Sequence, residues 1–336
     1  MTATELEHFK ELLTLQEDNL SSWLDEPDSD RHNEIHKVQT LLGQVRHALG
    51  KVEDKTYGIC PECHEEISIH NLEIQPAQQV CIDCISPEDK VNLEEELFLA
   101  SKIHRALLPQ SIGAINGFEI AVKSLSARTV GGDYYDFLPG FNGGITRVII
   151  ADIMGKGIPA GLLMSNIQGA LKVLADDIQS PSGLIDRLNH WFCRNVPVTK
   201  FISLACIAVE PGSRNQSKIT YTNAGHCPPI LARKTGEVEI LEPTGGVLGV
   251  HEGFAYEQRD LTLSSGDLIL LYTDGVTEAE NEAGEQFEED KLKELLQGHG
   301  KKDIESIPEI VIEEVRAYTG KQEFGDDLTI IALRKK

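Results

Sequence analysis

Aspartates recur beside glycines in four segments of the chain, and this pattern suits a site for hard metal ions. The segments are Gly131–Asp136, Asp152–Gly157, Tyr272–Gly275 and Gly325–Thr329. Mg²⁺ and Mn²⁺ prefer oxygen ligands, and glycine neighbours let the backbone come close to a metal cluster. A single Asp-Gly pair is ordinary turn chemistry. Four such segments, each beside an expected strand, favour a shared metal site.

Four of the seven cysteines form two close pairs, Cys60 with Cys63 and Cys81 with Cys84. Four thiolates suit a tetrahedral Zn²⁺ site and leave no coordination position for a substrate, so we expect one structural zinc ion. The alternative is four buried free cysteines without a metal. The other three cysteines are scattered through apolar segments, which indicates free thiols in a core.

The segments around the aspartates are typical of a mixed α+β domain. Beyond residue 111, short β-rich runs follow one another, and two helical stretches near residues 158–177 and 182–195 interrupt them. Layers of sheet covered by helices account for this alternation. The aspartate segments adjoin the expected strands, so strand ends would carry the metal ligands.

The first 110 residues are expected to be largely helical around the cysteine pairs. Apolar residues recur at helical spacing over residues 4–24 and 32–52, on either side of an acidic turn with Pro27, which predicts an antiparallel helical hairpin. A third helix is expected over residues 88–108. Its apolar face would be exposed to water in a single chain, so we expect it to pair with the same helix of a second copy in a homodimer or to dock on the neighbouring domain. The residues of this face are Leu93, Leu97, Ala100, His104 and Leu107.

The composition is strongly acidic and excludes several classes of partner. The 336 residues include 31 Lys and Arg against 54 Asp and Glu, a net charge of −23. Such a charge repels phosphate backbones, so we expect no direct nucleic-acid partner. No apolar run approaches the roughly 20 residues of a membrane helix, so we expect no membrane association. The N-terminus lacks the features of a signal peptide, which favours a cytoplasmic location.

The aspartate segments resemble the SpoIIE/RsbU branch of the PPM-type serine/threonine phosphatases. The resemblance implies an αββα sandwich and a metal-dependent protein phosphatase that hydrolyses phosphoserine or phosphothreonine. It also implies a phosphorylated substrate, a STAS-type anti-sigma-factor antagonist in a bacterial partner-switching pathway. The matching motifs span about residues 100–336 and are Leu107–Pro109, Gly131–Asp136, Asp152–Gly157, Thr222–His226, Tyr272–Glu278 and Asp326–Thr329.

The resemblance also implies a role for each aspartate. Asp133 and Asp152 would bridge two Mn²⁺ or Mg²⁺ ions, and the carbonyl of Ile153 would add a ligand. Asp274 and Asp326 would hold one ion. Two divalent ions lower the pKa of a shared water enough to leave hydroxide at neutral pH, and this hydroxide would attack the phosphorus in line.

Other positions of the expected site are less clear from the motifs. Arg128 matches the place of a phosphate-binding arginine in some relatives, and a bidentate guanidinium suits phosphate; the alternative is a surface arginine. Met154 stands where many PPM phosphatases have the histidine assigned as general acid, so protonation of the leaving group has no assigned residue. His226 is a substitute for that role or a structural residue of its turn.

The region before the phosphatase-like part resembles the DksA/TraR family over roughly the first 90 residues. The motifs are Tyr57–Cys60 and Leu72–Pro76, which leads into Cys81–Cys84. Members of that family insert a long coiled coil with an Asp-x-x-Asp-x-Ala tip into RNA polymerase. This chain has Asp25, Asp28 and Asp30 at the tip of shorter arms, so the alternatives to polymerase binding are docking, sensing or dimerisation.

Together these patterns predict a domain order. We expect a helical hairpin over residues 1–56, a four-cysteine zinc finger over 57–86, a linker helix over 87–110 that serves as a dimer or switch element, and a phosphatase domain over 111–336. The predicted function is a regulated protein phosphatase. The alternative is a transcription regulator that binds RNA polymerase and carries an inactive phosphatase-like sensor domain.

Overall fold

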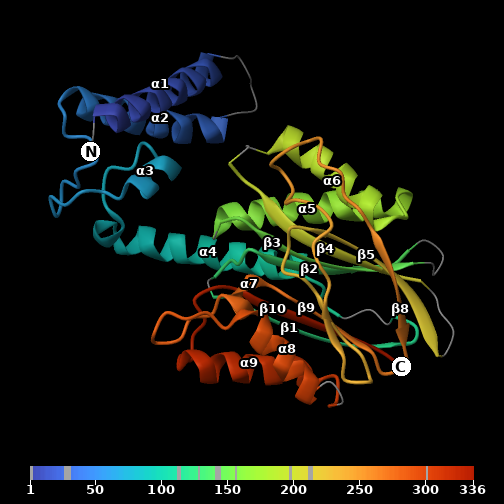
Figure 1. Ribbon diagram of the computed structural model, residues 1–336. Coiled ribbons are helices and arrows are strands. Elements are labelled where there is room, and N and C mark those ends of the chain that lie inside the picture. The colour runs from blue at the N-terminus through green and yellow to red at the C-terminus, as the bar shows by residue number, and fades with distance from the viewer. Residues whose placement is uncertain are drawn as a thin grey trace. The chain divides into compact units, whose positions relative to one another are not determined.

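The computed structural model describes residues 3–25, 32–111, 115–127, 129–140, 145–155, 157–196, 199–210, 215–299 and 302–336. The chain divides into two compact units, Met1–Glu95 and Glu96–Lys336 (Figure 1). Each unit has a hydrophobic core of its own.

The first unit contains the predicted helical hairpin and the cysteine pairs. Helices α1 (Ala3–Asp25) and α2 (His32–Glu53) pack side by side in Figure 1. Phe9 and Leu13 of α1 are buried with Val45 of α2 because apolar residues at helical spacing fall on one face. The same core extends to Tyr57 and Cys60, so the hairpin and the cysteine region form one folded unit. Two short helices follow, α3 (Ile69–Ile74) and the 3-10 helix η1 (Ile82–Cys84).

Helix α4 (Pro87–Leu107) has two apolar faces, and the sequence predicted one of them. On the predicted face, His104 is buried and Leu107 packs against the core of the second unit, which matches the docking alternative. The opposite face exposes Phe98 at 62%, Leu99 at 58% and Ile103 at 56%. This second face was not foreseen, because the spacing pattern was assigned to a single seam.

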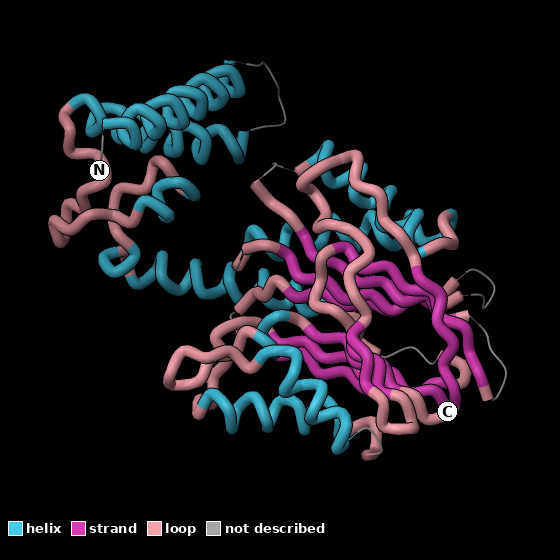
Figure 2. Tube along the Cα trace, viewed as in Figure 1, coloured by secondary structure: helices cyan, strands magenta, loops and turns pink. Residues whose placement is uncertain are grey.

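The second unit is built on two antiparallel sheets of five strands each, coloured magenta in Figure 2. The first sheet has the order β1 (Phe118–Leu125), β10 (Leu328–Lys335), β9 (Leu268–Tyr272), β6 (Ile230–Ala232), β7 (Val238–Ile240). The second has the order β2 (Asp133–Leu138), β3 (Thr146–Ile153), β4 (Ile202–Val209), β5 (Gln216–Ala224), β8 (Arg259–Ser264).

Helices cover the outer face of each sheet, so the unit has four layers. Helices α5 (Ile158–Asp177) and α6 (Pro181–Asn195) share a core with the β2–β5 strands. Helices α8 (Glu288–His299) and α9 (Ser306–Thr319) share a core with the other sheet, and a third core fills the space between the sheets. A one-turn helix, α7 (Asp274–Thr277), follows β9. The predicted α+β class and αββα sandwich are confirmed.

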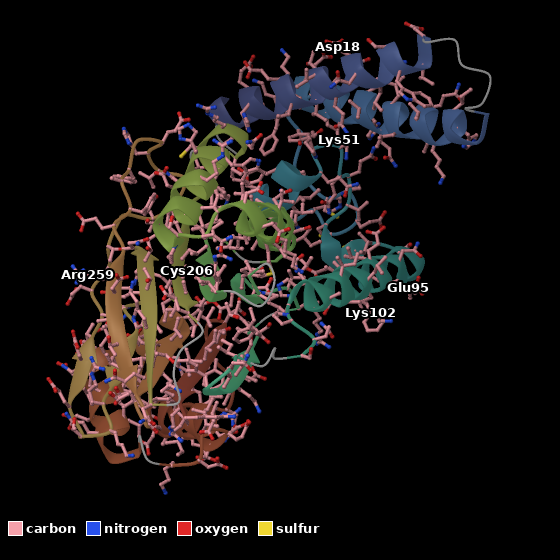
Figure 3. All side chains as sticks on the ribbon, turned by 90° about the vertical axis from the view of Figure 1, so that its right-hand side faces the viewer. Asp18, Lys51, Glu95, Lys102, Cys206 and Arg259 are labelled. Carbon is pink, nitrogen blue, oxygen red and sulfur yellow. The ribbon has the colours of Figure 1, made fainter. Side chains whose placement is uncertain are left out.

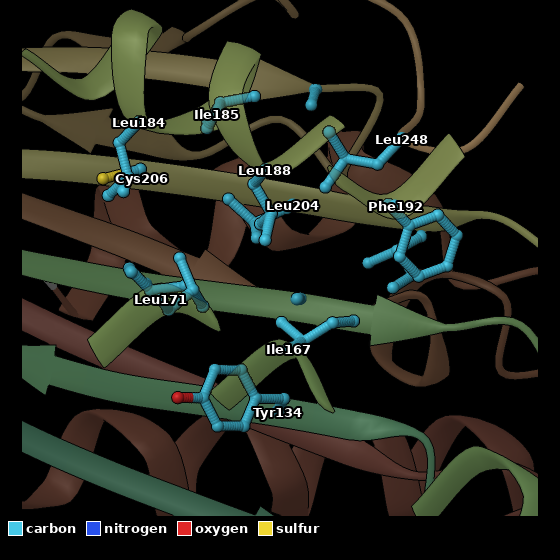
Figure 4. Packing of buried hydrophobic residues seen from close by; sticks show 14 of the residues in the cluster. Tyr134, Ile167, Leu171, Leu184, Ile185, Leu188, Phe192, Leu204, Cys206 and Leu248 are labelled. Atoms are coloured by element: carbon cyan, nitrogen blue, oxygen red, sulfur yellow. The ribbon is translucent and has the colours of Figure 1, made fainter. Parts of the chain in front are cut away.

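Helix α5 packs one face into this core and exposes apolar side chains on the other, Leu162 at 63% and Val173 at 70%. By length and composition it is the one helix among the described residues that could span a membrane, so the expectation that no run approaches this length was wrong. Ile167 and Leu171 of α5 are fully buried in one cluster with Leu184 and Leu188 of α6 and Cys206 of β4 (Figure 4). Figure 3 labels Cys206 among all the side chains of the protein. Burial of each such aliphatic side chain contributes roughly 1.5–3 kcal/mol, which stabilises the packing of α5 on the sheet.

Candidate active site

The alternation of side chains along the strands places the aspartates. In β3, Val148 and Ile150 point into the core between the sheets, so Asp152, two residues farther on, lies on the same inner face. Asp152 pairs directly with Asp133 of β2 and, on its other side, with Ser203 of β4. The apolar core between the sheets therefore ends in a row of polar side chains.

Two threonines of the opposite sheet complete this polar edge. Thr273 Oγ1 donates a hydrogen bond to Asp133 Oδ2 at 2.8 Å, and the Thr329 amide donates to Thr273 Oγ1 at 2.9 Å. Burial raises the pKa of Asp133, and the hydrogen bonds from Thr329 and Thr273 oppose that change. Neither threonine was a predicted site residue, although Thr273 stands two residues after buried Leu271 of β9 and Thr329 two residues before buried Ile331 of β10.

The remaining predicted aspartates gather around Asp152. Burial raises the pKa of Asp152 to about 7, and the charges of Asp274, Asp326 and Asp327 act in the same direction. Asp274 begins the short helix after β9, and Asp326 lies in the loop before β10. A cation among these groups would favour their ionised form and so reverse the direction of the shift.

The backbone beside Asp152 leaves a small space between two predicted ligands. A Cβ atom added at Gly132 would lie 2.8 Å from the carbonyl oxygen of Ile153 and 3.2 Å from Asp152 Oδ1. A side chain at this position would fill the space between these two oxygens. Clustered carboxylate and carbonyl oxygens are the donor set that Mg²⁺ and Mn²⁺ prefer, so the residues present fit such ions.

Asp274 and Asp326 open onto a cavity of about 250 Å³. One basic side chain, Lys321, contributes to its wall. Because the other charged lining residues are acidic, the cavity suits a cation better than a free anion. These acidic residues are Asp274, Glu278, Glu280, Glu323 and Asp326.

Two further aspartates of the motifs, Asp327 and Asp136, accept hydrogen bonds from other residues of the protein. Asp327 accepts hydrogen bonds from the Gly132 amide at 2.6 Å and the Ala127 amide at 2.7 Å, so it holds the loop that leads to Asp133. Asp136 accepts from the Tyr134 hydroxyl at 2.8 Å. Tyr134 belongs to the core under α5 and α6, so Asp136 lies on the face of β2 away from the site.

The other two predicted positions have different outcomes. Arg128 lies outside the residues that the structure describes, so its role stays a prediction. His226 is buried, with 3% of its surface exposed, and its Nδ1 lies 2.7 Å from Ser203 Oγ. Burial lowers the pKa of His226 to about 4. A neutral, enclosed ring matches the structural alternative better than the role of a general acid.

The four cysteines form a tighter cluster than the aspartates. Their sulfur atoms all lie within 4.8 Å of one another, and they are the one group of three or more His, Cys, Asp or Glu ligands this compact in the described part of the chain. Hydrogen bonds from the backbone, first that of Cys81, lower the pKa of Cys60 to about 6, which favours the thiolate form that zinc binds. The cluster fits the expected zinc site.

Two family models match separate parts of the chain. Stage II sporulation protein E (SpoIIE) matches residues 142–336, and the prokaryotic dksA/traR C4-type zinc finger matches residues 55–89. Together with the cysteine cluster, the second match shows a zinc finger of the four-cysteine type.

Curated and solved proteins agree with this division. The chain is 32% identical to phosphoserine phosphatase RsbU of Bacillus subtilis over 247 residues, which cover 73% of this chain and 71% of that protein. It is 28% identical to the RNA polymerase-binding transcription factor DksA of Salmonella typhimurium over 107 residues, which cover 25% of this chain and 71% of DksA. The crystal structure of the RsbU and RsbW domains of a Mycobacterium tuberculosis protein matches with 26% identity and a TM-score of 0.58, covering 68% of this chain and 63% of that one.

Proposed function

Because the chain belongs to the SpoIIE phosphatase family, we propose that it hydrolyses phosphoserine or phosphothreonine in a protein substrate with the help of two Mn²⁺ or Mg²⁺ ions. One observation carries the proposal. Asp133 and Asp152 form a direct cross-strand pair at the edge where Asp274 and Asp326 of the opposite sheet also meet.

Each group at this edge has a proposed task. Asp133 and Asp152 would bridge the ions, the Ile153 carbonyl would add a ligand, and Asp274 and Asp326 would hold one ion. When bound, such ions acidify a water and neutralise charge on the phosphate. Separately, the hydroxyls of Thr273 and Thr329 orient Asp133, and Asp327 holds the preceding glycine loop in place.

The activity can be tested with p-nitrophenyl phosphate and a phosphoserine peptide, each with and without Mn²⁺. We expect Mn²⁺-dependent turnover by the full chain and none by Asp274→Asn. Asp136→Asn is a matched control, because Asp136 lies on β2 but faces away from the site. Equal rates for the full chain and Asp274→Asn would refute the proposal.

The substrate follows from the family resemblance. We assign it to phosphorylated STAS-type anti-sigma-factor antagonists of a partner-switching pathway that regulates a sigma factor in the cytoplasm. The test is loss of the phosphorylated band of such a protein on a phosphate-affinity gel. Dephosphorylation of an unrelated phosphoprotein at the same rate would contradict this substrate class.

The domains over residues 1–56, 57–86 and 87–110 are proposed to regulate the phosphatase domain over 111–336. Helix α4 is the connecting element, because its His104 Nε2 lies 3.1 Å from the carbonyl oxygen of Gly131, two residues before Asp133. The exposed face of α4 around Phe98 and Ile103 would pair with a second copy in a homodimer. Light scattering should therefore show a dimer that Phe98→Glu converts to a monomer, and an unchanged mass would contradict it.

A second candidate function rests on the similarity of the first unit to DksA. RNA polymerase would then bind the hairpin tip, whose Asp28 and Asp30 lie outside the described residues. The discriminating experiment is capture of purified RNA polymerase by the full chain and by a variant with Asp25, Asp28 and Asp30 changed to Ala. If the full chain retains phosphatase activity but does not capture RNA polymerase, the result would support the phosphatase function and contradict the second candidate.

A further inference from the structure

His226 lies just after β5 and contacts Ser203 of β4 next to the candidate active site. Its Nδ1 lies 2.7 Å from Ser203 Oγ, and Ser203 is the direct cross-strand partner of Asp152. The contact is enclosed, because the His226 residue is only 3% exposed. A hydrogen bond shielded in this way holds its groups more firmly than one exposed to water.

The turn that carries His226 is fixed on its own side. Asn223 accepts from the His226 amide at 2.7 Å and donates to the His226 carbonyl at 3.0 Å. Gly225 has φ +65, and a Cβ atom there would lie 2.6 Å from Cγ1 of Val247. Only glycine fits this conformation and contact without strain. The imidazole therefore has a defined position and cannot follow Ser203 if that strand shifts.

The other ring nitrogen faces the second sheet. The backbone of Tyr272 in β9 interacts with the ring and raises its pKa, against the larger effect of burial. No described residue forms a hydrogen bond with Nε2, so the contact with Ser203 is the side-chain hydrogen bond of the ring in the described part of the chain.

We propose that His226 and Ser203 form a positioning pair that holds Asp152, the cross-strand partner of Ser203, in place to bind the metal ions. The proposal rests on the proposed function, because it concerns the ions of that site. The Ser203 hydroxyl donates a hydrogen bond to His226 Nδ1, and the fixed turn of His226 thereby limits movement of the strand segment that pairs with Asp152. Residues that orient metal ligands typically change metal affinity 10–100-fold when they are replaced.

The test is Mn²⁺ affinity measured by electron paramagnetic resonance on the zinc-loaded full chain, without substrate. We expect Ser203→Ala and His226→Gln each to lower the Mn²⁺ affinity about tenfold. The Mn²⁺ affinity of the double variant should be no lower than that of the single variant with the lower affinity. His226→Asn keeps an acceptor near the position of Nδ1 and should bind Mn²⁺ more tightly than His226→Gln. Ser217→Ala, a buried serine of β5 outside the aspartate edge, is the matched control and should leave the affinity unchanged.

The outcomes separate this inference from the proposed function. Wild-type affinity, within twofold, in folded Ser203→Ala or His226→Gln would overturn the positioning pair, as would losses that multiply in the double variant. If His226→Gln fails to fold, the milder Ser203→Ala decides by the same threshold. Asp152→Asn should abolish the Mn²⁺ binding of the unaltered chain. If the unaltered chain binds no Mn²⁺, or if Asp152→Asn binds it equally well, the proposed function itself fails and this inference fails with it.

Discussion

The chain contains two candidate metal sites, and they are assembled in opposite ways. The cysteine site takes all its ligands from residues 60–84, and its sulfur atoms cluster within 4.8 Å. The proposed ligands of the aspartate site lie between residues 133 and 326, on two strands of one sheet and in segments that adjoin strands of the other. The first site depends on one local stretch of chain, whereas the second depends on the register and packing of a whole domain.

The sites share one electrostatic property. Neighbouring thiols, first that of Cys81, raise the pKa of Cys84 to about 12. Burial, together with neighbouring carboxylates, raises the pKa of Asp152 to about 7. Neighbouring thiols at Cys84, and burial followed by neighbouring carboxylates at Asp152, oppose the anionic form, so a bound cation would relieve a cost at each of these two positions. The difference between the sites therefore lies in what holds the ligands together.

The largest expected effect is at the aspartate site. Asp152→Asn should lower Mn²⁺-dependent kcat by about 10³-fold, because the carboxylate proposed to bridge the two ions becomes a neutral amide. Its zinc content should be unchanged, since the cysteine site lies in the other unit. Turnover of p-nitrophenyl phosphate and metal analysis check both statements. Loss of zinc together with activity would show that the two sites are not independent.

Cys63→Ser should have its main effect on the first unit. We expect loss of zinc and protease sensitivity within residues 1–95, because a structural zinc ion contributes directly to folding. Turnover of p-nitrophenyl phosphate should stay within about threefold of the unaltered chain. Cys193→Ser, which changes a half-buried thiol outside the cluster, is the control and should retain zinc. Equal zinc content in the two variants would count against the cysteine site.

Thr273→Val should lower kcat about tenfold, because Asp133 loses a hydrogen bond that orients it. Thr220→Val is the matched control, since Thr220 bonds to Asp260 on a different strand pair. The measurement is kcat and KM with a phosphoserine peptide. A change in KM alone would indicate that Thr273 acts on substrate binding and not through Asp133.

The smallest effect is on stability and depends on pH. The folded-state pKa of Asp152, about 7, exceeds its ordinary value of 3.8, so the folded chain keeps a proton that the unfolded chain has released. The contribution of this group to stability therefore falls as pH rises from about 4 to 7, by on the order of 1–4 kcal/mol. The measurement is urea unfolding without added Mn²⁺. The free energy of unfolding of Asp152→Asn, relative to that of the unaltered chain, should increase as the pH rises from 5 to 8. A difference that does not change with pH would contradict this.

Several features could be predicted from the sequence because they depend on nearby residues or on recognisable motifs. The spacing of Cys60, Cys63, Cys81 and Cys84 indicates a compact site, and alternating β-rich runs with helices indicate an α+β domain. The αββα sandwich followed from the family resemblance. Other features could not. The second apolar face of α4 and the burial of α5 depend on which side of each helix meets a core, and periodicity alone does not decide that.

By itself, the amino-acid sequence determined which chemical groups are present: the thiols of a zinc finger and the aspartates that adjoin strands. Only the tertiary structure decided which of them meet. The register opposes Asp133 to Asp152 and Asp152 to Ser203, while packing brings Thr273 to Asp133 and His226 to Ser203. The physical reason is that strand pairing and side-chain packing act between residues far apart in the chain, whereas a Cys-x-x-Cys turn closes within four residues.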